Sequence, residues 1–292
     1  MGKLKILVTG KQGQLGYALQ ELSKNQFEFS WKFTDRSELD ITDSMKIQSV
    51  LKQFEPDWII NAAAYTDVDG AESNEEIAYK VNADGPYILA KSAKEIGAKL
   101  VHISTDYVFD GTKNEPYTEN DKPNPLQVYG KSKLKGELFI QDTNITGFII
   151  RTSWVYGNHG KNFVNTILKL AKEKNEIQVI DDQFGSPTYV KDLGNVVIEL
   201  VSKRQFNEME LYHFSNNGVI SWFDFAKCIK QLMNLDLKIQ RINSCDYYKS
   251  NFRPTYSVLD LKKINSFYKS IVHYKKSLKT FFQKKMNIQL IH

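Results

Sequence analysis

Cysteine is rare in this sequence: its 292 residues include two, Cys228 and Cys245. Two cysteines at these positions are too few for a disulfide framework or a cysteine-rich zinc site. We therefore expect no structural metal.

Long hydrophobic runs are absent as well, since no stretch approaches the ~20 apolar residues that span a bilayer. Near the start, the β-prone run at residues 4–9 leaves no room for a cleavable export signal. The sequence therefore predicts a cytoplasmic protein without a membrane partner.

Acidic residues are missing after Asp260, where the chain has eight lysines and no Asp or Glu. A basic segment can bind nucleic acid or a membrane surface. No nucleic-acid-binding motif accompanies these lysines, so we expect no nucleic-acid partner. We interpret the segment as a solvated terminal helix whose hydrophobic side chains, Phe267, Leu278, Phe281 and Phe282, face the body of the protein.

The first half of the chain alternates strand-like and helix-like segments. Strands are predicted at residues 4–9, 29–34, 57–61, 99–104 and 147–151, and helical stretches separate them, including a long one that ends at Gly97. Strands joined by helices of this length need crossover connections, which produce a mostly parallel, doubly wound sheet. Beyond Tyr156 the alternation weakens. We therefore expect an α/β fold with a Rossmann-type domain at 1–155 and a smaller lobe at 156–292, with the chain crossing between them.

A glycine-rich loop follows the first predicted strand and opens the first helix. Gly10, Gly13 and Gly16 form a G-x-x-G-x-x-G pattern, which differs from the G-x-G-x-x-G spacing most typical of dinucleotide binding. Glycines here allow a tight turn and let the backbone approach a pyrophosphate, while the helix N-terminus offers free N–H groups. The position of the loop favours a dinucleotide site over an ordinary strand-to-helix turn.

Asp35 and Arg36 come directly after the second predicted strand. A carboxylate there can accept from the 2′-hydroxyl of an adenosine ribose, and an arginine can accommodate a 2′-phosphate. The sequence offers both, so NADPH is slightly favoured as cofactor and NADH stays open.

A Tyr-x-x-x-Lys pair occurs twice, at Tyr129 with Lys133 and at Tyr87 with Lys91. Two side chains at this spacing share one helix face, and the cation is expected to lower the pKa of the phenol, which can then donate a proton to a carbonyl oxygen. Chance produces this spacing about as often as it is seen here. Tyr87 lies within a long amphipathic helix, which favours a packing role for that pair.

Position separates Tyr129 from its counterpart. It follows Ser104-Thr105-Asp106, which ends the fourth predicted strand, while Asn61-Ala62-Ala63-Ala64 ends the third. In an open α/β sheet the ligand lies across the carboxyl ends of the strands. A Thr105 hydroxyl at that edge could polarise the oxygen that Tyr129 protonates, and the alanines would let a flat ring approach. The histidines show no catalytic arrangement, so His102, within a strand, and His213, beside a loop, are expected to be structural.

These motifs together resemble the extended short-chain dehydrogenases/reductases, and within them the dTDP-4-dehydrorhamnose reductases. The supporting runs include residues 64–69, Arg151-Thr152-Ser153-Trp154-Val155-Tyr156-Gly157 and Asp182-Gln183-Phe184-Gly185-Ser186-Pro187-Thr188. Arg253-Pro254 and Ser257-x-Leu259-Asp260 also fit, and the likeness covers about residues 4 to 265.

The resemblance implies reduction of the C4 keto group of dTDP-4-dehydro-L-rhamnose by NAD(P)H. It makes 1–155 the NAD(P)-binding domain, 156–292 mainly a substrate-binding lobe, and the nucleotide-linked deoxysugar the partner, with a homodimer as the usual oligomer. Tyr129 would donate the proton, Lys133 would hold the ribose and tune Tyr129, and Thr105 would bind the keto oxygen. The predicted cofactor-binding residues are Gly10, Gln12, Gly13, Gln14, Leu15, Gly16, Asp35, Arg36, Asp40, Ile41, Ala62, Ala63, Ala64, Tyr129 and Lys133. The predicted substrate-binding residues are Thr66, Thr105, Asp106, Trp154, Gln183 and Arg253, and no metal ligands are predicted.

Two alternatives stay open. Another nucleotide-sugar reductase or an epimerase could use the same fold, and an epimerase would return the hydride to a cofactor that stays bound. A non-catalytic regulatory subunit, similar to that of methionine adenosyltransferase, is the other; retention of Thr105, Tyr129 and Lys133 argues against it, since binding alone needs no proton donor.

Overall fold

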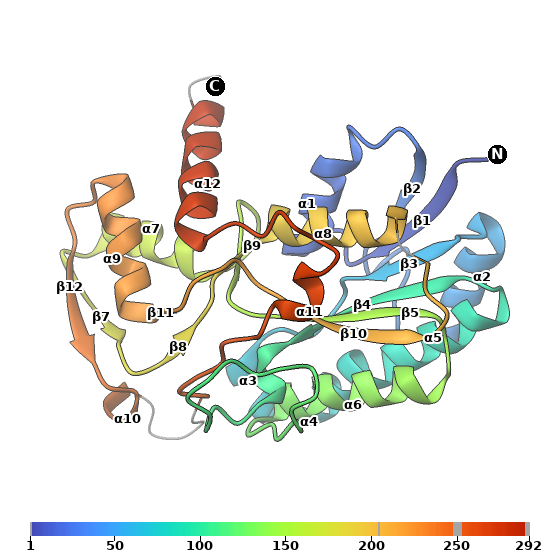
Figure 1. Cartoon of the computed structure of the whole chain (residues 1–292), viewed down its shortest axis with the longest axis horizontal. Helices are drawn as coiled ribbons and strands as arrows, with labels where there is room; N and C mark the ends of the chain where they lie inside the picture. The colour runs from blue at the N-terminus through green and yellow to red at the C-terminus, as the bar shows by residue number, and fades with distance from the viewer. Residues whose placement is uncertain (1, 204, 248–252, 290–292) are drawn as a thin grey trace.

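The computed structural model describes residues 2–203, 205–247 and 253–289, with side chains described up to residue 285. Figure 1 shows two parts, a sheet with helices on both faces and a smaller part formed by the second half of the chain.

A six-stranded parallel sheet forms the larger part, in the order β10-β5-β4-β3-β1-β2. The strands are β1 (Leu4–Thr9), β2 (Phe29–Phe33), β3 (Trp58–Asn61), β4 (Lys99–Thr105), β5 (Gly147–Thr152) and β10 (Met209–Phe214). This confirms the predicted fold class and the five predicted strands, each to within about one residue at either end. β10 was not predicted, and it places His213 inside a strand rather than beside a loop.

Helices cover both faces of this sheet because its side chains alternate between two cores. Ile6 and Val8 of β1 pack with α1 (Gln14–Ser23) and α8 (Val190–Lys203), whereas Leu7 packs with α2 (Ser44–Phe54), α5 (Gly85–Glu95) and α6 (Val128–Asp142). Strands buried on both faces are the expected pattern for a doubly wound sheet. All carboxyl ends of the parallel strands then meet at one edge.

The long helix predicted before Gly97 is interrupted in the structure. It consists of α3 (Val68–Ser73), α4 (Glu75–Tyr79), the π-helical turn η1 (Lys80–Asp84) and α5. The amide of Asn82 in η1 bonds the backbone of Tyr65, accepting at 2.8 Å from its N–H and donating at 3.0 Å to its carbonyl. This long-range contact has no signature in the local hydrophobic period, which is why the sequence suggested one continuous helix.

The smaller part is built around its own hydrophobic core. Its longer elements are α7 (Phe163–Glu173), β7 (Glu176–Ile180), α9 (Trp222–Met233), β12 (Lys238–Ile242) and α12 (Tyr274–Gln289). The short elements are β6 (Val155–Tyr156), β8 (Phe184–Gly185), β9 (Thr188–Tyr189), β11 (Ile220–Ser221), α10 (Ser244–Tyr247) and α11 (Lys262–Asn265). Because α8 and β10 belong to the larger part, the chain passes between the two parts more than once.

The lysine-rich C-terminal segment packs largely as expected. Leu278, Phe281 and Phe282 of α12 are at most 2% exposed. Phe267 is 46% exposed, so its predicted burial was wrong. It lies between α11 and α12 rather than on the packed face of α12.

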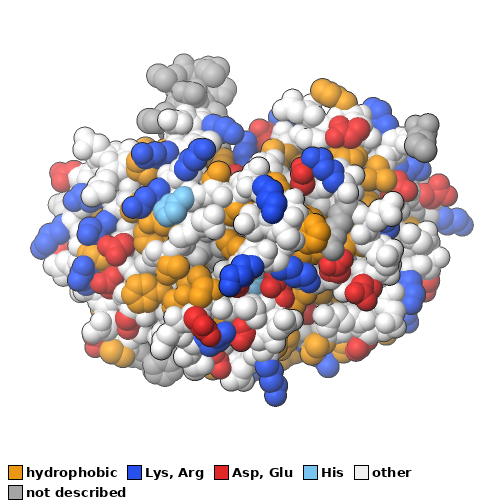
Figure 2. Space-filling model, viewed as in Figure 1, with side chains coloured by type: hydrophobic (Ala, Val, Ile, Leu, Met, Phe, Trp, Pro, Cys, Tyr) orange, Lys and Arg blue, Asp and Glu red, His pale blue; other side chains and the backbone are white. Residues whose placement is uncertain are grey.

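The surface carries charges of both signs. Figure 2 shows Lys and Arg interspersed with Asp and Glu over the visible face, without a broad field of one sign. Within the described residues, no helix combines the length and apolar character needed to cross a bilayer.

Candidate functional site

A cavity of about 460 Å³ lies at the carboxyl ends of β1, β3, β4 and β5. The predicted site residues that line it are Gln12, Gly13, Gln14, Leu15, Ala62, Ala63, Ala64, Thr66, Thr105, Asp106, Tyr129, Lys133 and Trp154. The remaining predicted residues do not line it: Gly10, Gly16, Asp35, Arg36, Asp40, Ile41, Gln183 and Arg253. The structure thus brings together the strand-end residues that the sequence pattern singled out.

The glycine loop is pressed against the end of β3. Gly10 has a φ of +68°, and a Cβ there would lie 2.7 Å from the backbone nitrogen of Ala63. A Cβ on Gly16 would lie 2.6 Å from the Cα of Lys11. Gly13 is the N-cap of α1 and offers no side-chain cap, so the first N–H groups of the helix remain for an anion.

Tyr129 lies in α6 with its phenol facing Thr105. Burial, opposed by a hydrogen bond with Thr105 and assisted by the charge of Asp106, raises the pKa of Tyr129 to about 12. The sequence predicted that Lys133 would lower this pKa, and for the protein without its cofactor that prediction is wrong. Tyr129 is held protonated, as a proton donor requires.

Lys133, one turn further along α6, is 2% exposed. Its ammonium donates to the Ile103 carbonyl at 2.6 Å and lies 3.2 Å from Nε2 of His102. Burial lowers the pKa of Lys133 to about 8, and the charge of Glu137 opposes the shift. Burial thus dominates, because a charged amine loses most of its hydration there.

Glu137 is itself committed to other partners. Arg151 of β5 bonds it through Nη2 at 2.6 Å, and the Ser104 hydroxyl also donates to it. The two charged side chains are 2% and 4% exposed. This buried pair fastens α6, which carries Tyr129 and Lys133, to the middle of the sheet.

The residues predicted to set cofactor specificity lie beside the glycine loop and do not line the cavity. Hydrogen bonds from Ser37 and Lys11 lower the pKa of Asp35 to about 2. The Lys11 ammonium lies 3.1 Å from Asp35 and 2.6 Å from Glu38. Arg36 is paired with Asp40 at 2.9 Å and its side chain is 84% exposed. Lys11 was missed by the sequence reasoning, although its position inside the glycine motif was a signal.

On the opposite side, Trp154 lines the cavity in a restricted conformation. Its φ is +47°, and its ring stacks on Trp222 with centroids 3.4 Å apart. A Cβ on Gly185 would lie 2.5 Å from the Trp154 indole. The indole is thus held between α9 and β8.

Gln183 and Arg253 lie away from this cavity. Gln183 is 2% exposed. Arg253 pairs with Asp69 of α3 at 3.0 Å and lines a smaller cavity of about 220 Å³ beside Trp222. The stacked tryptophans lie between the two cavities.

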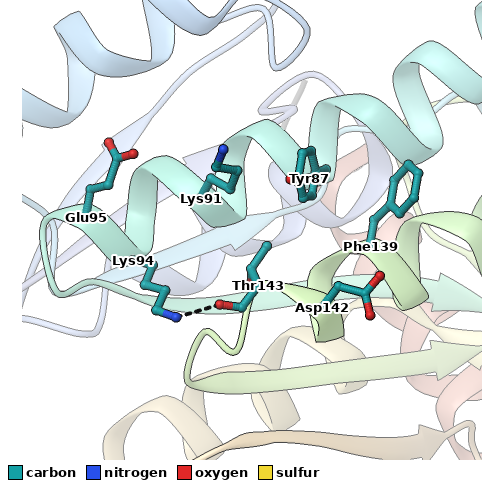
Figure 3. A pocket seen from close by; sticks show the side chains of 7 residues that line it. All are labelled: Tyr87, Lys91, Lys94, Glu95, Phe139, Asp142 and Thr143. Atoms are coloured by element: carbon teal, nitrogen blue, oxygen red, sulfur yellow. Dashed lines mark hydrogen bonds between the residues drawn. The ribbon is translucent and has the colours of Figure 1, made fainter.

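The second Tyr-x-x-x-Lys pair lies elsewhere, in a surface groove of about 700 Å³ between α5 and α6. Figure 3 shows Tyr87 and Lys91 on α5 with Phe139 of α6 across from them. The Tyr87 and Phe139 rings are 5.4 Å apart, and the Lys91 ammonium lies 5.6 Å from the Tyr87 centroid. The described residues that line this groove belong to α5, α6 and the position after α6, and the contact between the two rings supports the packing interpretation.

Further residues of the main cavity were not predicted. They are Val68, Ile103, Ser104, Tyr107, Thr152, Val155, Gly160, Lys161 and Leu193. The Gly160 and Lys161 loop is tied to the glycine loop, because Asn162 donates to Gln14 Oε1 at 3.1 Å. The sequence could have indicated this loop, because two glycines and Lys161 follow shortly after the predicted Trp154.

In the described part of the chain, no three His, Cys, Asp or Glu side chains gather in an arrangement that could hold a metal ion.

Comparisons with known proteins agree on one family. Residues 4–287 match the RmlD substrate binding domain. The dTDP-4-dehydrorhamnose reductase of Aggregatibacter actinomycetemcomitans is 42% identical over 270 residues, which cover 89% of this chain and 92% of that protein. The spore coat polysaccharide biosynthesis protein SpsK of Bacillus subtilis (strain 168) is 40% identical over 282 residues, covering 96% and 98%.

A solved structure is equally similar. The crystal structure of dTDP-4-dehydrorhamnose reductase from Bacillus anthracis str. Ames in complex with NADP superposes with a TM-score of 0.91 at 40% identity, covering 97% of this chain and 99% of that one.

Proposed function

This chain belongs to the RmlD substrate binding domain family, and from that premise we propose that it reduces the C4 keto group of dTDP-4-dehydro-L-rhamnose, with NADPH as the preferred cofactor. The family makes the chain a nucleotide-sugar reductase similar to dTDP-4-dehydrorhamnose reductase, dependent on NAD(P)H. The sugar, the preference for NADPH and the roles of the individual residues are the proposal.

The residues present fit a dinucleotide. Gly10 and Gly16 have no room for a side chain, so the backbone of the loop is exposed to a pyrophosphate, and the free N–H groups of α1 face the same space. Ala62, Ala63 and Ala64 would lie against the flat rings, and Lys161 adds a cation at the cavity mouth. When bound, the nicotinamide supplies a hydride to the keto carbon.

Tyr129 provides the matching proton. The phenol is protonated at neutral pH because its pKa is raised to about 12, and the Thr105 hydroxyl beside it can donate to the same keto oxygen. As the carbon–oxygen double bond becomes an alkoxide, the proton passes from Tyr129 to that oxygen. Lys133, a turn away, supplies the positive charge that stabilises the resulting phenolate.

The sugar and its nucleotide would extend from Thr105 toward the smaller part. Thr66, Asp106 and Trp154 line the main cavity, and Arg253 lines the smaller one. We assign Thr66, Asp106 and the indole of Trp154 to the sugar. Arg253 is assigned to the diphosphate, for which a guanidinium is well suited, and Gln183 to the positioning of these groups.

The preference for NADPH rests on cations beside the second strand. Lys11 and Arg36 each pair with carboxylates that a 2′-phosphate could replace. Asp35 remains able to accept from a free 2′-hydroxyl. The same residues therefore allow NADH as a weaker cofactor.

One observation carries the proposal: the Thr105, Tyr129 and Lys133 side chains line a single cavity with the glycine loop in a chain of this family. The test is the loss of NADPH absorbance, with NADH in parallel, when dTDP-4-dehydro-L-rhamnose is generated in the cuvette. We expect oxidation that depends on the sugar and is faster with NADPH. Cofactor binding without oxidation would contradict the proposed substrate.

A second candidate is reduction of another nucleotide-linked 4-keto-6-deoxysugar. SpsK, at 40% identity, is named for spore coat polysaccharide biosynthesis rather than for one sugar. Assaying a panel of dTDP- and UDP-linked keto sugars under the same conditions separates the two: this alternative predicts a higher kcat/KM for a sugar other than dTDP-4-dehydro-L-rhamnose.

A further inference from the structure

Three polar side chains cross the apolar sheet in one row. Thr9 of β1 is paired in register with Asn61 of β3, and Asn61 with His102 of β4. All three are at most 1% exposed. We call Thr9, Asn61 and His102 the polar row. Polar groups are costly to bury, so each needs a partner.

The hydrogen bonds along the row have a direction. The Thr9 hydroxyl donates to Asn61 Oδ1 at 2.7 Å, and the backbone N–H of Ala63 donates to the same oxygen at 3.3 Å. The same N–H also reaches Thr9 Oγ1 at 3.4 Å, so the Thr9 hydroxyl is the main donor that orients the amide with Oδ1 toward β1. Its Nδ2 therefore faces Nδ1 of His102, at 3.1 Å, and donates to it.

This direction settles which nitrogen of His102 carries hydrogen. The imidazole is neutral, because burial and the charge of Lys133 hold its pKa well below the usual value. A neutral imidazole has one N–H and one acceptor nitrogen. Since Nδ1 accepts from Asn61, the hydrogen is on Nε2, which lies 3.2 Å from Nζ of Lys133.

An N–H directed at Nζ favours the amine over the ammonium, because only the amine has a lone pair to accept it. In the described part of the chain, the charge that acts on Lys133 is that of Glu137 on α6, and Glu137 is paired with Arg151 of β5. The titratable side chains of Tyr129 and Asp106 line the same cavity as Lys133. The carbonyl of Ile103 accepts from Lys133 in either form.

We propose that His102 is a positioning residue for Lys133: through the polar row it presents an N–H to Nζ and so enables the lysine to release a proton toward Tyr129. Once the phenol has protonated the substrate, a proton leaves Nζ and restores the phenol from the phenolate. The electron pair of the broken N–H bond stays on Nζ and accepts the His102 Nε2–H. This inference rests on the role that the proposed function gives to Lys133.

The first test needs no turnover and no cofactor. Histidine ¹⁵N NMR of the cofactor-free protein identifies the tautomer of His102, with assignment from the H102Q variant. The proposal predicts hydrogen on Nε2 and no titration between pH 6 and 9, a window set around ordinary histidine behaviour. Hydrogen on Nδ1 overturns it, whatever the substrate proves to be.

The second test measures Lys133 directly, by ¹³C NMR of [6-¹³C]lysine-labelled protein with K133R for assignment. In H102Q the side-chain amide can turn its oxygen to Nζ and accept from the ammonium, so the Lys133 pKa should rise by about one unit. H213Q is the matched control, because His213 is also fully buried in the sheet but bonds the Tyr117 carbonyl.

If the enzyme turns over as proposed, the alkaline limb of its kcat profile should move with the Lys133 pKa in H102Q and stay in place in H213Q. An unchanged or lowered Lys133 pKa in folded H102Q contradicts the inference. Loss of activity in both variants without a change in either profile also contradicts it, because that result indicates a purely structural histidine. Absence of activity in the unaltered protein would instead count against the proposed function.

Discussion

Tyr129 is the residue on which the chemistry depends. Tyr129→Phe removes the proton donor and leaves the ring that packs beside Thr105. We predict that kcat falls by at least about 100-fold, the usual contribution of a positioned acid. Cofactor affinity, measured by fluorescence titration, should change less than twofold.

The matched control is Tyr87→Phe, the same change in the other Tyr-x-x-x-Lys pair. Turnover should be unaffected there, since Tyr87 lies in the groove between α5 and α6. Wild-type turnover by Tyr129→Phe would remove Tyr129 from the mechanism.

The buried carboxylate of Asp106 is expected to lower the stability of the protein at neutral pH while it helps to bind the sugar. Burial raises its pKa from 3.8 to about 6. The folded protein therefore binds this proton more tightly than the unfolded chain, so its contribution favours folding below pH 4 and is progressively lost as pH rises through 6. At pH 8, Asp106→Asn should raise the free energy of unfolding, by up to about 3 kcal/mol.

The same variant should bind the sugar more weakly, because an amide accepts fewer hydrogen bonds than a carboxylate. Urea denaturation at pH 5 and pH 8, with KM for the sugar in parallel, checks both effects. An equal change in the free energy of unfolding at the two pH values would show that burial does not raise the pKa of Asp106.

The sequence predicted most of these residues because several strand ends marked the same edge. Thr105, Asp106 and Tyr129 follow from that geometry. His102 was taken as structural because a histidine within a strand carries no local signal. Its contact with Lys133 depends on the register of three strands and on the position of α6, and neither can be derived from the local sequence pattern. Lys11 was missed although it stands inside the glycine motif, because its carboxylate partners, Asp35 and Glu38, follow a different strand.

At the scale of elements, the position of α6 determines whether Tyr129 and Lys133 reach the cavity. Gly136 allows the close approach of α6 to η1, because a Cβ there would collide with the carbonyl oxygen of Asn82. Asn82 also donates to Ser132 of α6 at 3.0 Å. The π-helical turn thus serves as a support for the catalytic helix.

Gly136→Ala should therefore displace α6. We expect a loss of about 1–3 kcal/mol in the free energy of unfolding, as for other overpacked sites, and a lower kcat with cofactor affinity affected less. Lys131→Ala, at an exposed position of the same helix, is the control and should change neither quantity appreciably. Equal behaviour of the two variants in denaturation and steady-state assays would argue against tight packing at Gly136.

Elements were predictable where the hydrophobic period is local and strong. β1 to β5 followed from apolar runs, whereas the break in the helices before Gly97 depends on the bond between Asn82 and Tyr65. β10 was not predicted, because Glu210 and His213 interrupt its apolar residues and the pattern is not typical of a buried strand. Its place is fixed by pairing with β5.

At the scale of the whole molecule, the second half of the chain completes the first. α8 supplies Leu193, Val196 and Val197 to the core above the sheet, and β10 supplies Tyr212 and Phe214. Without them the sheet would end at β5 and one of its faces would be largely uncovered. A boundary at residue 155 therefore divides the chain in sequence, but the two segments do not pack as independent units.

A fragment of residues 1–155 should accordingly fail to fold cooperatively, despite carrying the glycine loop, Thr105, Tyr129 and Lys133. Far-UV circular dichroism during thermal unfolding, compared with the full chain, tests this. A sharp transition and measurable NADPH binding by the fragment would contradict this reasoning.

The central claim is that hydride passes from the cofactor to a keto carbon of the nucleotide-sugar, with net consumption of cofactor. The most direct measurement uses NADPH carrying deuterium at both C4 positions, with the product sugar analysed by mass spectrometry and NMR. Our account predicts one deuterium bound to C4 of the sugar for each NADP⁺ formed. A sugar without deuterium, or an epimerised sugar formed without net NADP⁺, would contradict it.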